Sequence, residues 1–177
     1  MKVKTKSETR KLRKQLVFQK TSISIVDSKP VIIAKEKIFK DEVVFLFEGR
    51  YYSHPNSTSI QIDVSRHIDV PSGFDTEDQK LYWKFLGHSC DPSGYINTED
   101  LTFVALRDIE SGEALTYDYN TTEFDIFYPF DCTCKSDNCT GRVSGFKHLD
   151  KEIKKKIQPK LAPHLKLFFL YDCSFIM

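Results

Sequence analysis

Three cysteines within a span of eight residues are the feature of this sequence that most restricts its fold. Cys132, Cys134 and Cys139 form the pattern C-x-C-x-x-x-x-C in a chain of 177 residues. Successive side chains of an extended segment point to opposite faces, so the first pair reaches one ion only where the backbone turns, and the sequence KSDN that follows supplies turn-forming residues. Structural zinc takes four nitrogen or sulfur ligands. We therefore predict a metal site whose fourth ligand is one of Cys90, Cys173, His88 and His148.

The charge of the chain is nearly balanced. Lys and Arg number 26 against 25 Asp and Glu, which gives a formal net charge of +1. Because such a molecule has no strong overall field for nucleic acid or for a membrane, we predict direct binding to neither. Basic residues concentrate in residues 2–14 and 151–156, and we interpret both groups as solvated helix faces.

The first residues are charged and lack the apolar stretch of a secretory signal, and no apolar run approaches the length of a membrane span. We expect an intracellular protein, in the nucleus or cytoplasm of a eukaryote or in the cytoplasm of a bacterium. In a reducing compartment its five cysteines are expected to be thiols or metal ligands rather than disulfides.

Short β-rich runs bounded by Pro, Gly, Asp or Ser dominate the middle of the chain, which predicts a single, mainly β domain of the β-rich α+β class. A helix or frayed arm is expected over residues 1–20, and a short helix or turn over 76–86 with Thr76 as its cap. Pro159 and Pro163 divide the apolar C-terminal stretch into two short helices. Strands are predicted at residues 22–26, 31–34, 43–47, 60–64, 101–106 and 114–119.

Two segments of the sequence resemble the signatures of one family. Residues 85–93 (FLGHSCDPS) and 113–120 (EALTYDYN) are similar to the F-[IL]-N-H-S-C-x-P-N and G-E-E-L-x-[FY]-D-Y signatures of SET-domain protein-lysine methyltransferases. Residues 31–49 resemble the opening strand pair of these enzymes, and residues 141–149 (GRVSGFKHL) resemble their post-SET tail. The order and separation of the motifs match as well, so the resemblance covers the chain from about residue 22 to residue 149.

The resemblance implies a fold of small curved sheets in which the two signature segments thread past each other in a pseudoknot. It divides the chain into a basic N-terminal arm (1–21), a SET domain (22–122), a post-SET zinc-binding segment (123–149) and a C-terminal helical tail (150–177). It also implies the fourth ligand, because Cys90 of the HSC motif would join the three post-SET cysteines on one structural Zn²⁺.

The reaction that the resemblance implies is methyl transfer from S-adenosylmethionine to the side-chain amine of a lysine in a protein or peptide, histone or non-histone. The nucleophile must be a neutral amine, whereas lysine in water has a pKa of about 10.4. A channel lined by apolar and aromatic side chains disfavours the ammonium form, which suits a chain with 14 Phe and 8 Tyr.

The resemblance also assigns the site residues. Tyr119 takes the catalytic position, with its hydroxyl near the transferring methyl group. Tyr117 takes the position where the family alternates Phe and Tyr, and its extra hydroxyl predicts a preference for monomethylation. The cofactor site would be formed by Val31, Gly87, His88, Tyr119 and Phe146, with Val143 as the competing choice for Phe146.

Several positions depart from the family pattern. Gly87 and Ser93 replace asparagines, Lys84 stands where arginine is common, and no G-x-G occurs at residues 28–31. A lost hydrogen bond of this kind weakens cofactor binding by about 1 kcal/mol.

Three other functions are weighed against methyl transfer. One is a catalytically inert SET-like module that binds lysine-bearing peptides or serves as a scaffold. A zinc-dependent nucleic-acid module is disfavoured by the balanced charge. A thiol hydrolase built on His88 and Cys90 is disfavoured because residues that alternate along an extended segment are expected to face away from each other.

Overall fold

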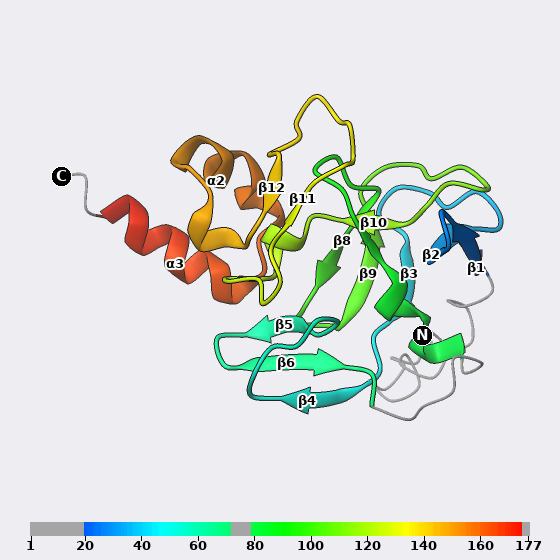
Figure 1. Ribbon diagram of the computed structural model, residues 1–177, viewed down its shortest axis with the longest axis horizontal. Helices are drawn as coiled ribbons and strands as arrows, with labels where there is room; N and C mark the ends of the chain where they lie inside the picture. Colours follow the sequence, from blue (N-terminus) through cyan, green and yellow to red (C-terminus); the bar gives the residue numbers. More distant parts are fainter. Residues whose placement is uncertain (1–19, 72–78, 175–177) are drawn as a thin grey trace, which may run out of the picture.

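The computed structural model describes residues 20–71 and 79–174 (Figure 1). The expected N-terminal helix or arm and the cap at Thr76 lie outside these residues. The strands are β1 Thr21–Val26, β2 Lys29–Ala34, β3 Val43–Leu46, β4 Arg50–Tyr52, β5 Ile60–Asp63, β6 Arg66–Asp69, β7 Gly87–His88, β8 Gly94–Asn97, β9 Thr102–Ala105, β10 Thr116–Tyr117, β11 Phe130–Asp131 and β12 Arg142–Val143. The helices are α2 Lys151–Ile157, α3 Pro163–Ser174 and the 3-10 helices η2 Gln79–Phe85, η3 Tyr119–Thr121, η4 Phe146–His148 and η5 Gln158–Lys160.

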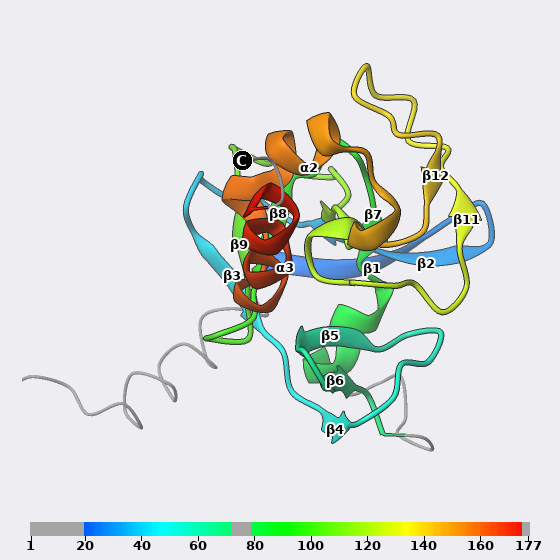
Figure 2. The same ribbon diagram turned by 90° about the vertical axis from the view of Figure 1, so that its left-hand side faces the viewer.

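The strands form small separate sheets, as predicted. β1 and β2 make an antiparallel hairpin, and two three-stranded antiparallel sheets have the orders β3-β9-β8 and β4-β6-β5. Two further pairs are only two residues long: β11 with β12 is antiparallel, and β7 with β10 is parallel. Figures 1 and 2 show α2 and α3 at one end of the molecule and the β1–β2 hairpin at the other.

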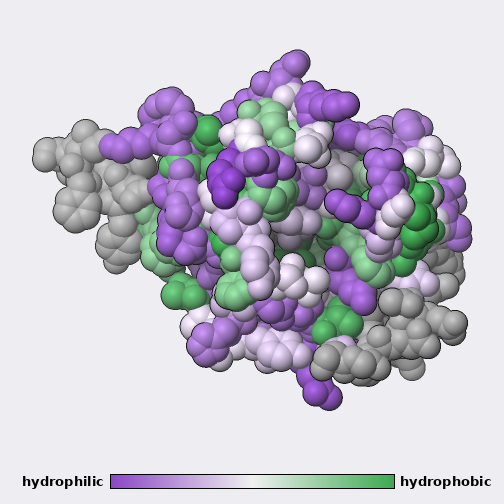
Figure 3. Space-filling view, viewed as in Figure 1, coloured by the Kyte–Doolittle hydropathy of each residue, from purple (hydrophilic) through white to green (hydrophobic). Residues whose placement is uncertain are grey.

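The β1–β2 hairpin turns through two residues in the left-handed region, Asp27 (φ 49°) and Ser28 (φ 63°). Turns with two positive φ values match the twist of the flanking strands. The turn leaves β2 two residues longer at its start than predicted, because Val26 pairs with Lys29. Figure 3 shows apolar residues gathered over this hairpin, whose exposed apolar side chains are Ile25 and Val26.

A main hydrophobic core that is rich in aromatic rings joins β2, β3, β5, β6, β8, β9 and β10. Phe45 of β3 stacks on Phe103 of β9 with ring centroids 5.2 Å apart, and Phe47 meets the edge of Trp83 at 5.2 Å. Trp83 is buried and its indole N–H donates to the carbonyl of Glu48 at 2.8 Å. The core therefore fixes η2, the element that leads directly into β7.

A second cluster of buried residues lies under the C-terminal helices and contains Phe146, Leu161 and Leu165. The predicted division of this region into two helices is confirmed. Pro163 is the first residue of α3 and Pro159 lies within η5, positions where the missing N–H costs little. No helix in residues 20–71 and 79–174 is both long and apolar enough to cross a bilayer.

Several sequence-based assignments differ from the structure. The strand predicted over 114–119 is only Thr116–Tyr117, because Asp118 accepts a hydrogen bond from the backbone of Asn120 at 3.0 Å and caps η3. The antiparallel strands β4, β6 and β8 were missed, and so were the two-residue strands β7, β11 and β12. β6 nevertheless buries His67 and Ile68.

Gly94 is required by close packing in β8. A β-carbon there would lie 2.2 Å from Cζ of Phe103 and 2.6 Å from the carbonyl oxygen of Val104. We expect Gly94→Ala to lower the free energy of unfolding by about 1–3 kcal/mol, the usual effect of overpacking a core, as measured by urea denaturation. Gly87→Ala is the matched control, because its β-carbon would meet only Cγ2 of Thr116 at 3.7 Å. Equal denaturation midpoints for the two variants would contradict the packing argument.

Candidate functional site

The two signature segments meet in the parallel pair β7–β10. Thr116 is opposite Gly87, and Tyr117 is opposite His88. Beside this pair the fully buried Ser93 accepts a hydrogen bond from the backbone N–H of Thr116 at 2.9 Å, and its own N–H donates to the hydroxyl of Thr116 at 3.2 Å. Ser93, where the family has asparagine, therefore joins the two segments through its side chain. We call the arrangement of 87–93 against 116–119 the crossing.

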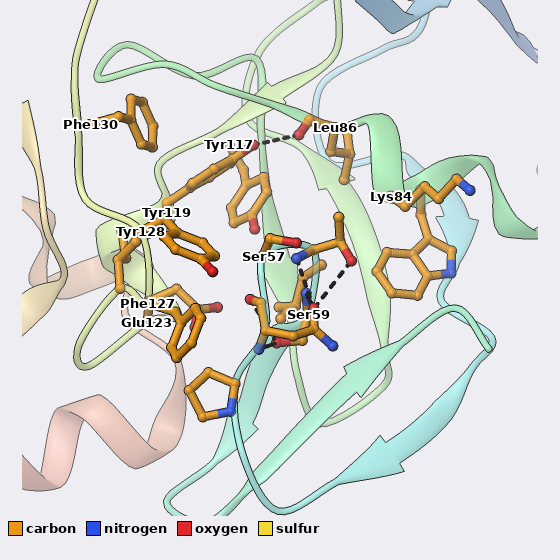
Figure 4. Close-up of a pocket in the computed structure, with 16 residues that line it drawn as sticks. Ser57, Ser59, Lys84, Leu86, Tyr117, Tyr119, Glu123, Phe127, Tyr128 and Phe130 are labelled. Carbon is orange, nitrogen blue, oxygen red and sulfur yellow. Dashed lines mark hydrogen bonds between the residues drawn. The ribbon is translucent and has the colours of Figure 1, made fainter. Parts of the chain in front are cut away.

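The side chains of Tyr117 and Tyr119 extend from the crossing to the same side, and their ring centroids lie 4.6 Å apart. The hydroxyl of Tyr119 donates to the carbonyl of Leu86 at 2.7 Å (Figure 4). Burial raises the pKa of Tyr119 to about 12 and that of Tyr117 well above its ordinary value. Both phenols are therefore neutral hydrogen-bonding groups at physiological pH.

Both tyrosines line a cavity of about 150 Å³ (Figure 4). The loop 55–59 forms the opposite wall, and two backbone N–H groups, of Thr58 and Ser59, donate to the side chain of Asn56 at 2.8 and 2.9 Å. The remaining lining residues are mostly apolar or aromatic: Ile60, Trp83, Lys84, Leu86, Glu123, Ile126, Phe127, Tyr128 and Phe130. The arrangement suits a long apolar side chain with a polar end.

Glu123 in this wall was missed by the sequence analysis. Its carboxylate accepts hydrogen bonds from the backbone N–H of Gln61 at 2.7 Å and from the hydroxyl of Thr122 at 3.2 Å. Burial raises the pKa of Glu123 to about 7. The available signal was weak: an acidic residue in TTEF, four positions after Tyr119 and followed by an apolar residue.

The residues assigned to the cofactor lie in the crossing, in β2 and in the second core cluster. Among the described residues, Val31, Gly87, His88 and Phe146 do not line the tyrosine cavity. Gly87 and His88 lie in the crossing, and Val31 lies in β2. Phe146 is 1% exposed in the second core cluster, with the ammonium of Lys154 4.8 Å from its ring centroid. The cofactor role of these four residues stays a prediction.

The four cysteines Cys90, Cys132, Cys134 and Cys139 come together. Their sulfur atoms all lie within 4.8 Å of one another. His148, an alternative fourth ligand, instead bonds Asp125 at 2.8 Å, and the side chain of Cys173 lies outside the described residues. The set matches the tetrahedral sulfur donors that zinc prefers in structural sites.

Hydrogen bonds around the sulfurs fit a bound cation. The backbone N–H of Thr140 donates to Sγ of Cys90 at 3.5 Å, and that of Cys134 donates to Sγ of Cys132 at 3.5 Å. The pKa of the Cys132 thiol is raised to about 12 by burial, whereas that of Cys134 is lowered to about 6, and four thiolates this close together require a compensating positive charge. The residues present therefore fit a metal ion.

His88 connects the cysteine cluster to the crossing. Its Nδ1 accepts from the backbone N–H of Tyr119 at 3.2 Å, which leaves the proton on Nε2, 3.3 Å from Sγ of Cys90. Burial lowers the pKa of His88 to about 4, so the ring is neutral and donates to the sulfur. The expectation that His88 and Cys90 face away from each other is wrong, because the chain bends at Cys90. Cys90 shares the four-sulfur cluster, which argues against a hydrolase nucleophile.

The family model described as SET domain matches residues 25–120, more than half of the chain. The chain belongs to the SET domain family. The predicted membership is confirmed, and the crossing lies within the matched residues.

Named relatives carry related descriptions. The methyltransferase flvH of Aspergillus flavus is 32% identical over 84 residues, which are 46% of this chain and 46% of that protein. The variant-silencing SET domain-containing protein of Plasmodium falciparum is 35% identical over 134 residues, 68% of this chain and 5% of that protein. Histone-lysine N-methyltransferase ASHR3 of Arabidopsis thaliana is 42% identical over 64 residues, 33% of this chain and 12% of that protein.

A solved structure of KRYPTONITE in complex with mCHG DNA and SAH superposes with a TM-score of 0.54 at 21% identity, over 70% of this chain and 28% of that one. This likeness supports the fold. The chain spans less than half the length of each of these curated relatives and of this structure.

His164 at the start of α3 supports the segment after the crossing. Its Nε2–H donates to the carbonyl of Thr122 at 2.8 Å, while its buried Nδ1 has no hydrogen-bond partner among the described residues. Burial lowers the pKa of His164 from its ordinary 6.5. Below about pH 6.5 the unfolded chain therefore binds a proton at this histidine that the folded chain does not bind. The contribution of neutral His164 to the free energy of unfolding is present above that pH and is lost as the pH falls below it.

As the pH falls from 7.5 to 5.5, we expect the free energy of unfolding to decrease less steeply in His164→Gln than in the wild type. The two slopes should differ by up to about 1.4 kcal/mol per pH unit. Glutamine keeps an N–H donor for Thr122 and does not titrate. Urea denaturation at a series of pH values measures the slopes. Titration of His67 changes the slope in the same direction as His164, and titration of Asp118 and Glu123 changes it in the opposite direction. These groups are present in both proteins, so the difference between the two slopes reports on His164. Parallel curves would rule out the assignment to His164.

Proposed function

We propose that this SET domain transfers a methyl group from S-adenosylmethionine to the side-chain amine of a lysine in a protein or peptide, with a preference for monomethylation. The observation that carries the proposal is the placement of Tyr117 and Tyr119 on one wall of an aromatic cavity beside the crossing. The names of the relatives support it, since several are histone-lysine N-methyltransferases.

The cavity suits a lysine side chain chemically. S-adenosylmethionine supplies an electrophilic methyl group on a sulfonium. Rings from Tyr119, Tyr128 and Phe130 line the cavity and disfavour a solvated ammonium, which helps the amine reach its neutral form. The phenol of Tyr119 is fixed by its bond to Leu86, so it holds the amine in line at little further entropic cost.

Tyr117 is the basis of the monomethylation proposal. It is 4% exposed and packs against Tyr119. A phenol oxygen at this position occupies space that added methyl groups need, and it offers a hydrogen bond to the amine instead.

The substrate proposed is a lysine-bearing protein, histone or non-histone. Relatives from Aspergillus are described as specific for lysine 36 of histone H3, and a KRYPTONITE structure contains a histone H3 peptide. These descriptions support a peptide-binding surface at the mouth of the cavity, where Phe127 and Tyr128 are 55% and 64% exposed.

The four cysteines are proposed to hold one structural Zn²⁺ that positions Phe130. This residue precedes Cys132 by two positions, lines the cavity, and lies 5.8 Å from the ring of His88 and 6.0 Å from that of Tyr119. Binding of the metal would therefore hold one wall of the cavity against the crossing.

Tyr119→Phe tests the methyl-transfer proposal. Loss of the hydroxyl removes one hydrogen bond at the reacting nitrogen, and we expect kcat to fall at least about tenfold in transfer of a radiolabelled methyl group to proteins of a cell extract. Tyr51→Phe is the matched control, because Tyr51 is 58% exposed and lies away from the cavity. Equal labelling by both variants would remove Tyr119 from its role. A wild type that binds neither S-adenosylmethionine nor its demethylated product with zinc present would favour the inert module.

The metal proposal predicts one zinc ion per chain by elemental analysis. Cys134→Ser should lose the metal and lower the melting temperature, because metal binding contributes several kcal/mol to folding, and it should reduce methyl transfer through Phe130. Cys173→Ser is the matched control and should keep its zinc. A Cys134→Ser protein that retains both zinc and its melting temperature would refute the four-cysteine site.

A further inference from the structure

Glu123 is a carboxylate on the wall of the tyrosine cavity to which the proposed methyl transfer assigns no role. The residue is 7% exposed and lies in the chain just after η3. Acidic side chains are almost never this buried unless they are paired. Its placement beside Tyr117 and Tyr119 therefore calls for a partner that enters the cavity.

One oxygen of the carboxylate is fixed and the other is available. Oε1 accepts from the backbone N–H of Gln61 and from the hydroxyl of Thr122. Gln61 is itself held, because its side-chain oxygen accepts from the N–H of Phe124 at 2.8 Å. Oε2 has no hydrogen-bond partner among the described residues. Figure 4 shows the carboxylate near Phe127 and Tyr128, across the cavity from Ser57 and Ser59.

The groups that face Glu123 leave its charge uncompensated. Tyr117 and Tyr119 are neutral phenols, and His164, bonded to the neighbouring residue Thr122, is kept neutral by burial. Lys84 lines the same cavity, and its ammonium lies 5.0 Å from the ring of Phe85. No ion pair between Lys84 and Glu123 occurs in the described part of the chain.

We propose that Glu123 binds the ammonium group of the substrate lysine in the cavity and accepts its proton before methyl transfer. The inference rests on the proposed function and specifies how that site recognises a cationic side chain. A buried carboxylate is stabilised by an entering cation, because the pair interacts strongly where water is excluded. A neutral side chain of the same length gains no ion pair from it.

The proton transfer balances. The N–H bond of the ammonium breaks and an O–H bond forms at Oε2, which leaves a neutral carboxylic acid and a neutral amine. The nitrogen lone pair then forms a bond to the methyl carbon as the carbon–sulfur bond breaks, with its electron pair remaining on the sulfur of the sulfonium donor. The product is a methylammonium.

The acidity of Glu123 suits this transfer. A base acts best when its pKa is close to the working pH, and burial raises the pKa of this carboxyl to about 7. The same apolar surroundings lower the pKa of the bound ammonium from about 10.4. Burial moves the two values toward each other, and the ion pair between the two groups opposes that movement, so the proton transfers where burial outweighs the pairing.

Binding of n-butylammonium, a mimic of the lysine side chain, tests the first half of the proposal. Trp83 is the single tryptophan of the chain and lines the cavity, so its fluorescence reports entry of a ligand. We expect Glu123→Gln to bind n-butylammonium at least tenfold more weakly than the wild type, while both proteins bind 1-butanol equally. Glutamine preserves the acceptor for Gln61 and Thr122, and a thermal melt verifies that the variant is folded. Glu99→Gln, an exposed change of the same charge, should bind like the wild type.

The pH dependence of methyl transfer tests the second half. The wild-type kcat/KM should rise through about pH 7 as Glu123 loses its proton, and this limb should be absent in Glu123→Gln, whose kcat should be lower. Equal n-butylammonium affinities in folded wild type and Glu123→Gln would overturn the proposal, and an unchanged pH limb would overturn its proton-transfer step. A wild type that binds n-butylammonium through Glu123 but methylates no lysine would instead refute the proposed function and keep the cation site.

Discussion

The parallel pairing of β7 with β10 is the constraint on which the other parts of this SET domain depend. The pair is only two residues long, too little to be stable alone, and it is secured by the reciprocal bonds between Ser93 and Thr116 and by the bond from the backbone of Tyr119 to His88. Because β7 leads into Cys90 and β10 contains Tyr117 and leads into Tyr119, one crossing brings the cysteine cluster and the cavity together.

The C-terminal helices belong to the site as much as the crossing does. Three successive residues after Tyr119 accept hydrogen bonds from later parts of the chain: Asn120 from the N–H of Gly145 at 3.0 Å, and, from the C-terminal tail, Thr121 from the N–H of Ala162 at 2.8 Å and Thr122 from His164 at 2.8 Å. Gly145 has φ 103°, and a β-carbon there would lie 2.7 Å from the carbonyl oxygen of Phe124. The C-terminal helices thus hold the two residues that precede Glu123.

Site residues that lie in short contiguous motifs could be predicted from the sequence. Site residues whose environment depends on contacts with distant parts of the chain could not. Tyr117, Tyr119 and the cysteine pattern could be found because each lies in a contiguous signature. Glu123 could not, since its burial depends on Gln61, 62 positions away. The contact of His88 with Cys90 was predicted wrongly because strand alternation was assumed across a bend. The length of β10 was overestimated because the capping side chain of Asp118 competes with the sheet.

In the proposed function, Phe130 couples binding of the zinc ion to binding of the lysine side chain. Its ring lines the cavity. Its backbone lies in β11, which pairs with β12 opposite Val143 and leads into Cys132. A bound ion that orders β11 and β12 reduces the conformational entropy that these strands lose when a substrate packs against Phe130. By thermodynamic reciprocity, a side chain bound in the cavity must then tighten the hold of the cysteines on the metal by the same factor. The zinc site proposed here is in that sense part of the lysine site and more than a structural support beside it.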